Sequence, residues 1–148
     1  MRVRRYEAIH RWTTEAFAAS ADPARYPEAG PAWQAGRLFY GSIPRSALRR
    51  MVKLFTDSGL DSAFTGMDPE QMGMPDEDIT NVADVSEFVD LKMASLRRHA
   101  TQMGPNSPFA RLPADATRRM RGTEHFRLAA GTPLPVGADP SDLLAGLR

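Results

Sequence analysis

Prolines and glycines divide this 148-residue sequence into short segments, which limits the chain to short helices and strands. The stretch over 21–36 alone holds three prolines and two glycines and is expected to be an irregular connection. Before it, Ile9, Trp12 and Phe17 recur at the spacing of one helical face. This pattern predicts an amphipathic helix over 4–19.

The rest of the sequence predicts an alternation of short strands and helices. Alternating or apolar runs bounded by glycine favour strands, and apolar residues three or four apart favour helices. The expected elements are a strand over 37–42, a helix from Pro44 to about Ser58 ended by Gly59, one helical turn within 66–80, an edge strand over 79–82, a helix over 84–102 that starts on a capping-box-like Asp84 and Glu87, a short helix reaching 121, a strand over 124–129 and a closing helical turn over 142–147. The second helix is expected to bury Leu48, Met51, Val52 and Phe55.

Composition restricts the classes of protein. The hydrophobic fraction of 42% suffices for one modest core, and the absence of cysteine excludes disulfides, thiolate metal sites and a cysteine nucleophile. No apolar run approaches the roughly 20 residues that span a bilayer, and the N-terminus lacks a signal-peptide core. We therefore expect a soluble, cytoplasmic protein with no membrane partner.

Charge is unevenly distributed although the net charge is only +1. The segment 57–90 contains acidic residues and no basic ones, so the remainder is strongly basic. Such a split could indicate a nucleic-acid surface. However, the arginines are scattered over several predicted elements without a stacking-aromatic motif, and no nucleic-acid partner is expected.

Three histidines are the main candidates for chemistry. None has a second histidine or a carboxylate at a metal-ligand spacing. His99 borders an apolar helical stripe beside Lys92 and could bind a polar ligand, although the favoured interpretation is that it orders a loop through a backbone contact. His125 follows Glu124 on a predicted strand, where adjacent side chains point to opposite faces, so an acid/base pair is not expected. A surface or sheet-packing role is the alternative for His125, and His10 is expected to be solvated.

The acidic run over 76–78 does not match the pattern of a calcium site. Calcium loops place oxygen ligands at alternate positions with a glycine at the turn, and Asp68, Glu70 and Asp76 lack that register. A solvated face or a helix-capping role is therefore predicted for these carboxylates. The arginine pairs over 49–50 and 97–98 are expected on the polar faces of amphipathic helices.

Six strings in order along the chain resemble the C-terminal half of the LmbE-like, or PIG-L, deacetylase family. They cover nearly the whole sequence, and their order is more specific than any one of them. The strings are 22–33, 37–40 with 43–46, 73–80, 92–102, 124–128 and 142–148.

The resemblance implies a Rossmann-like α/β fold, of which this chain would contribute about four helices and a few short strands. Members are zinc-dependent amide hydrolases that deacetylate N-acetylglucosamine-type glycosides, including a mycothiol precursor, through a metal-activated water. Their Ala-His-Pro-Asp-Asp-Glu motif is absent, and their His-Pro-Asp-His motif would fall near Val3–Tyr6. No catalytic or metal-binding residue is carried over, and no zinc is expected on this chain alone. Substrate-side or supporting roles are the most that the resemblance implies for His99, Gln102, Glu124 and His125.

These observations predict that residues 1–148 form one C-terminal segment of such a deacetylase, lacking the N-terminal metal-binding half and inactive alone. Expected partners are that N-terminal half or a second copy of the chain, with a small glycoside as substrate. The alternative is a non-catalytic glycoside-binding or complementing module that acts with a separate N-terminal half.

Overall fold

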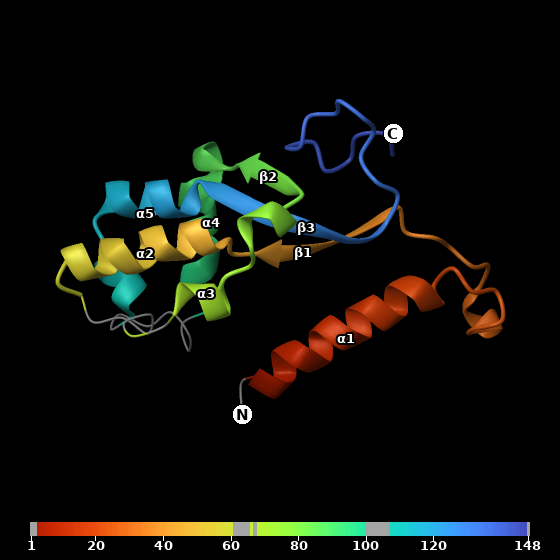
Figure 1. The fold of residues 1–148 in the computed structure, drawn as a ribbon. Coiled ribbons are helices and arrows are strands. Elements are labelled where there is room, and N and C mark those ends of the chain that lie inside the picture. Colours follow the sequence, from red (N-terminus) through yellow and green to blue (C-terminus); the bar gives the residue numbers. More distant parts are fainter. Residues whose placement is uncertain (1–2, 61–65, 67, 100–106, 148) are drawn as a thin grey trace.

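The computed structural model describes residues 3–60, 66, 68–99 and 107–147. This part of the chain holds five α-helices and one three-stranded antiparallel sheet, a mixed α/β structure (Figure 1). The helices are α1 (Val3–Ala19), α2 (Arg45–Asp57), α3 (Pro69–Met72), α4 (Val89–Arg97) and α5 (Ala114–Arg121), and the strands are β1 (Arg37–Ser42), β2 (Asn81–Asp84) and β3 (Thr123–Gly131). The expected α/β class is confirmed at this level, whereas the Rossmann-like placement stays a prediction.

The sheet has the order β1-β3-β2, so the last strand in the sequence lies in the middle. Strand β1 has the predicted bounds, and β2 is the predicted edge strand, displaced by two residues at each end. Ser42 of β1 and Val82 of β2 both lie opposite His125 of β3. The sheet therefore fixes His125 from both sides.

Helix α2 forms the centre of the hydrophobic core. Its amphipathic pattern buries Leu48, Met51 and Phe55 as predicted, while Val52 is only half-buried. The Phe55 ring packs edge-on against Phe109, with 5.2 Å between the ring centroids. The helix starts after Pro44, and Gly59 follows its end with a φ of 61°, a left-handed conformation that favours glycine.

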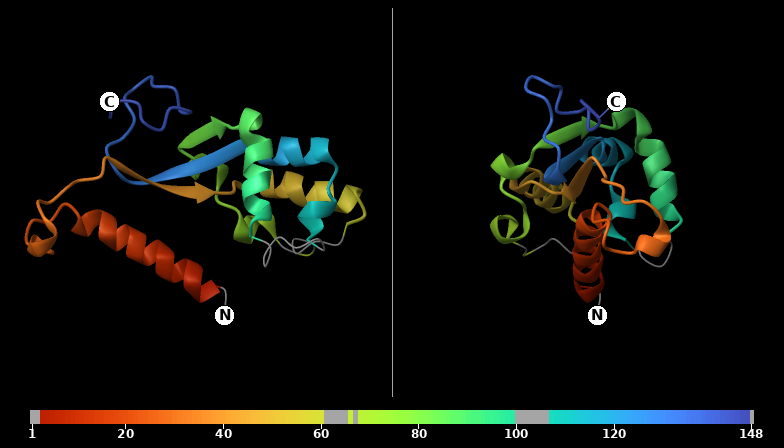
Figure 2. Two further views of the ribbon diagram at one scale, coloured as in Figure 1. Left: turned by 180° about the vertical axis from the view of Figure 1, so that it is seen from behind. Right: turned by 90° about the vertical axis from the view of Figure 1, so that its right-hand side faces the viewer.

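Helix α1 forms as predicted, but its apolar face is not buried. Ile9 and Trp12 are 58% and 59% exposed. The helix lies apart from α2, α4 and α5, which gather at one end of the sheet (Figures 1 and 2). It contacts β1 at Tyr40, whose hydroxyl shares a 2.5 Å hydrogen bond with the Thr14 hydroxyl and whose ring lies 4.5 Å from that of His10. His10 is exposed, as expected.

The long helix predicted over 84–102 is wrong in its bounds. A 3-10 turn occupies Ser86–Phe88, and α4 runs only from Val89 to Arg97. The Asp84 carboxylate accepts a 2.8 Å hydrogen bond from the Ser86 amide, and the Val85 amide donates to the Gly122 carbonyl at 2.7 Å. These two bonds hold the chain in a turn at the point where the helix was expected to begin.

The closing helical turn predicted over 142–147 does not form as a helix, because these residues form hydrogen-bonded turns. The Arg37 guanidinium donates hydrogen bonds to carbonyls on both sides of the loop, at 2.6 to 3.1 Å. Its acceptors are Thr132, Pro133, Leu143 and Ala145. A distant side chain thus takes the Leu143 carbonyl, which a helix over 142–147 would have used for its own backbone bond.

Candidate functional site

A hollow of about 500 Å³ lies where α2, α4 and α5 meet the start of β3. Two of the four predicted site residues, Glu124 and His125, line it. His99 does not, because it lies exposed beyond the end of α4, where its amide donates to the Leu96 carbonyl at 3.0 Å. Gln102 lies outside the described residues. The structure therefore brings together only the β3 pair.

Glu124 is held by Lys92 across the hollow. The Lys92 ammonium lies 2.5 Å from the Glu124 carboxylate and also donates to the Arg121 carbonyl at 3.2 Å. The sequence pattern associated Lys92 with His99 on one helix, whereas the structure pairs Lys92 with a strand residue. This pair joins α4 to β3 and neutralises both charges at the wall of the hollow.

His125 is half-buried next to Glu124. Burial lowers the pKa of its imidazole, the Arg50 cation lowers that pKa further, and the Asp76 carboxylate opposes the shift. The neutral imidazole is therefore favoured in the folded chain. It can donate and accept one hydrogen bond each toward a bound molecule.

Arg121 is the residue of this hollow that the sequence analysis missed. Its guanidinium stacks on Phe109, 5.0 Å from the ring centroid, and its Nε–H is buried without a hydrogen-bond partner. Burial lowers the pKa of the group. As the last residue of α5, Arg121 resembles the other arginines of its helix in sequence, and only the packing of Phe109 makes its environment different.

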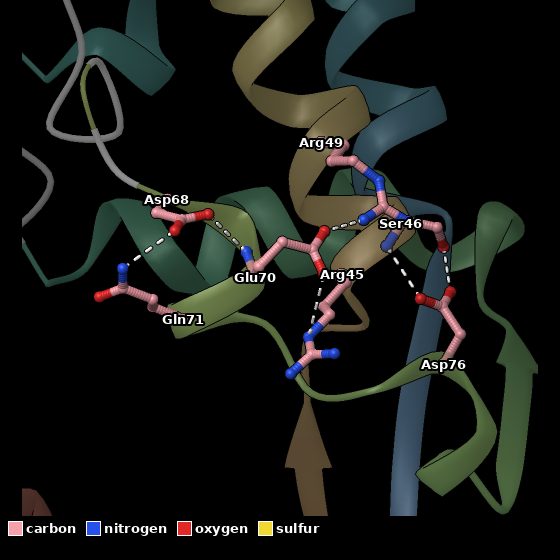
Figure 3. Close-up of polar contacts among 7 residues, drawn as sticks. All are labelled: Arg45, Ser46, Arg49, Asp68, Glu70, Gln71 and Asp76. Carbon is pink, nitrogen blue, oxygen red and sulfur yellow. Dashed lines mark hydrogen bonds and ion pairs between the residues drawn. The ribbon is translucent and has the colours of Figure 1, made fainter.

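The acidic segment before β2 has structural roles (Figure 3). The Asp76 carboxylate accepts hydrogen bonds from the amide and the hydroxyl of Ser46 in the first turn of α2. These bonds lower the pKa of Asp76, and the carboxylate lies favourably at the positive end of the helix dipole. The predicted capping role is thus confirmed, although the capped helix is distant in sequence.

Two further carboxylates of this segment, one capping a helix and one forming ion pairs, are also engaged within the chain (Figure 3). Asp68 caps the short α3 by accepting from the Glu70 amide at 2.9 Å and from the Gln71 amide group at 3.0 Å. The Glu70 carboxylate pairs with Arg49 and lies 3.6 Å from the Arg45 Nε. The segment over 68–76 is therefore held against α2 by the ion pairs of Glu70 and the hydrogen bonds of Asp76.

The described residues do not fit a metal ion. Across 3–60, 66, 68–99 and 107–147, no three histidine, aspartate or glutamate side chains come together in a way that could hold one. Within the same ranges no helix is both long enough and apolar enough to cross a membrane.

Comparison with known proteins relates the chain to one group of enzymes. It is 35% identical to the 1D-myo-inositol 2-acetamido-2-deoxy-alpha-D-glucopyranoside deacetylase of a Nocardioides species over 93% of this chain and 48% of that protein. The identities to the enzymes of the same description from Geodermatophilus obscurus and Frankia alni are 33% and 38%, over 93% of this chain and 48% and 50% of those proteins. The chain is a homologue of part of these deacetylases. It spans about half the length of the curated relatives it matches, and no protein-family model matches it.

Proposed function

We propose that this chain is the C-terminal part of an N-acetylglucosaminyl-inositol deacetylase, the part outside the metal site, and that it acts with a segment that supplies the metal ligands. The observation that carries this proposal is the alignment of 93% of the chain with about half of each relative. The metal-ligating side chains also support the proposal, because those of the described residues do not come together as a zinc site would require. The chain alone is then expected to be inactive.

The exposed surface supports a missing partner. The solvent-accessible area is 10609 Å², whereas a compact monomer of this mass exposes roughly 7,500 Å². Large apolar side chains contribute to the excess: Trp12 and Trp33 are 59% and 70% exposed, and a hollow of about 380 Å³ lies between Trp12 and Tyr26. We call the exposed area around Trp12, Tyr26 and Trp33 the α1 surface. We propose that the partner segment covers it, since exposed apolar patches of this kind mark interfaces.

Complementation tests the proposal. The chain is mixed with the segment of the Nocardioides relative that lies outside the alignment, and zinc-dependent release of acetate from the glycoside is measured. Each part alone should be inactive and the mixture active. Zinc-dependent turnover by this chain alone, or an inactive mixture in which the two parts bind each other, would overturn the proposal.

A matched pair of variants tests the α1 surface. Trp12→Glu introduces a charge on the exposed face of α1 and should prevent complementation, because the interface would have to bury that charge. Val136→Glu changes a fully exposed apolar residue near the C-terminus and should leave complementation intact. If the two variants affected complementation equally, the interface would have to lie elsewhere.

The second candidate is a non-catalytic glycoside-binding module. The observation that favours it is the hollow lined by Glu124 and His125, whose volume lies within the range of ligand pockets. Calorimetric binding of the intact glycoside to this chain, with no activity after complementation, would select this function over the first.

A further inference from the structure

The hollow beside Glu124 and His125 adjoins a second one of about 320 Å³ between α2 and α5. Basic side chains line both, and we call the two together the basic hollow. Its shared wall consists of Ala47, Met51, Met120, Thr123 and His125. Its basic residues are Arg50, Lys92, Arg119 and Arg121.

Two of these four cations are neutralised within the chain. Lys92 pairs with Glu124 at 2.5 Å, and Arg119 pairs with Asp115 at 2.7 Å. The carboxylate that acts on His125, Asp76, is engaged by Ser46. Each of these three carboxylates therefore already has a partner within the chain.

Within the described part of the chain the other two cations form no ion pair, although the charge of Arg50 acts at longer range on the Asp76 carboxylate. For the described part of the chain, neither the Arg50 nor the Arg121 guanidinium takes part in a hydrogen bond or an ion pair. Arg50 is exposed and solvated by water, so its charge costs little. Arg121 differs, because its Nε–H is buried and Phe109 covers its guanidinium plane.

A buried donor without an acceptor is unfavourable, and more so when the donor is charged. An anion in the hollow would not reach the buried Nε–H, but it would offset the positive charge of Arg121 by accepting hydrogen bonds from the terminal N–H groups of the guanidinium. Ile43, Ala47 and Met51 give the same hollow apolar walls that would suit an uncharged carbon portion. We propose that the basic hollow binds the acid group of a small organic anion, with Arg121 as its anchor.

This inference does not depend on which of the two proposed functions holds. The glycoside named for the relatives contains an acetamido group and hydroxyls but no acid group. An anion site is thus an addition to what that name implies. Carboxylate and phosphate present the same acceptor chemistry to a guanidinium, and two probes distinguish them.

The test is a titration of the full chain with small molecules. Binding is monitored by the NMR signals of the Arg121 Nε–H and the His125 ring. Acetate and inorganic phosphate are the anionic probes, and N-acetylglucosamine is the neutral one. We expect at least one anion to shift both signals with saturation at a dissociation constant of about 1 mM or below, roughly 4 kcal/mol of binding free energy. Whichever anion binds more tightly identifies the acid group.

Two arginine variants complete the test. Arg121→Gln should weaken anion binding at least about tenfold, and Arg121→Lys should retain more of it because the charge remains. Arg127→Gln, on β3 but outside the hollow, should leave binding unchanged. If Arg121→Gln does not fold, the titration of the unmodified chain decides. The proposal is overturned if neither anion shifts Arg121 with saturation, if Arg127→Gln weakens binding equally, or if only N-acetylglucosamine binds.

Discussion

The arm (residues 3–36) and the body (residues 37–147 as described) start from the same kind of sequence pattern and reach opposite outcomes. In the body, the apolar face of α2 is covered, leaving Phe55 only 1% exposed. In the arm, the apolar face of α1 leaves Trp12 59% exposed. The comparison teaches that an amphipathic pattern specifies a helix with a face to cover but does not specify what covers it.

The sharpest test of this difference is a pair of aromatic truncations. Phe55→Ala should lower the free energy of unfolding by about 3–5 kcal/mol, because it removes a buried ring and leaves a cavity. Trp12→Ala should change it by less than about 0.5 kcal/mol in the isolated chain, since the ring is already exposed. Urea unfolding followed by far-UV circular dichroism measures both. Equal losses would show that the arm is packed as firmly as the body.

The next effect concerns the junction between the C-terminal loop and β1. Arg37→Ala should destabilise the chain by about 2 kcal/mol, because four backbone carbonyls lose a charged donor and some of them regain water. The C-terminal residues should then be cleaved faster in limited proteolysis. Arg127→Ala, at an exposed position of β3, is the control and should change neither quantity.

A pair of glycines tests the boundary between arm and body. Gly131 has a φ of 97°, and a Cβ there would lie 2.3 Å from the Gly36 carbonyl oxygen, so Gly131→Ala should cost about 2 kcal/mol of stability. Gly59 also has a positive φ but open space around it, and Gly59→Ala should cost only about 1 kcal/mol. Thermal unfolding of both variants compares them. A smaller loss at Gly131 would mean that the boundary can rearrange.

The smallest effect is a pH dependence within the body. Because the folded pKa of His125 lies below its ordinary value of 6.5, the unfolded chain binds this proton more readily. The free energy of unfolding should therefore fall as the pH drops through about 6.5, before the carboxylates with lowered pKa values, such as Asp76, titrate below 3.8. His125→Gln should reduce this slope between pH 7 and 5. An unchanged slope in His125→Gln would assign it to another group.

The sequence predicted which segments form helices and strands better than it predicted the contacts between distant segments. Local periodicity correctly placed β1, α2 and α5, because a strand or helix pattern depends on neighbouring residues. It failed at 84–102 and 142–147, where a hydrogen bond from Val85 to the Gly122 carbonyl and hydrogen bonds from Arg37 compete with the helix. Such competition involves residues far apart in the sequence and leaves no local signal.

The candidate site shows the same division. Glu124 and His125 could be selected from the sequence, and the structure places both at one hollow. Their partners could not be selected, since Lys92 and Arg121 become neighbours of this strand only through the packing of α4 and α5. His99 was misplaced because its helix ends two residues earlier, at Arg97.

By itself, the sequence determined the alternation of short helices and strands, the carboxylates that serve as caps and the homology to a group of deacetylases. These depend on residue type and spacing, which local physical chemistry interprets directly. Only the tertiary structure decided that the α1 face stays exposed, that Arg37 holds the C-terminal loop and that the Arg121 Nε–H is buried without a hydrogen-bond partner. Burial and charge pairing are properties of contacts, and contacts exist only once distant segments have been brought together.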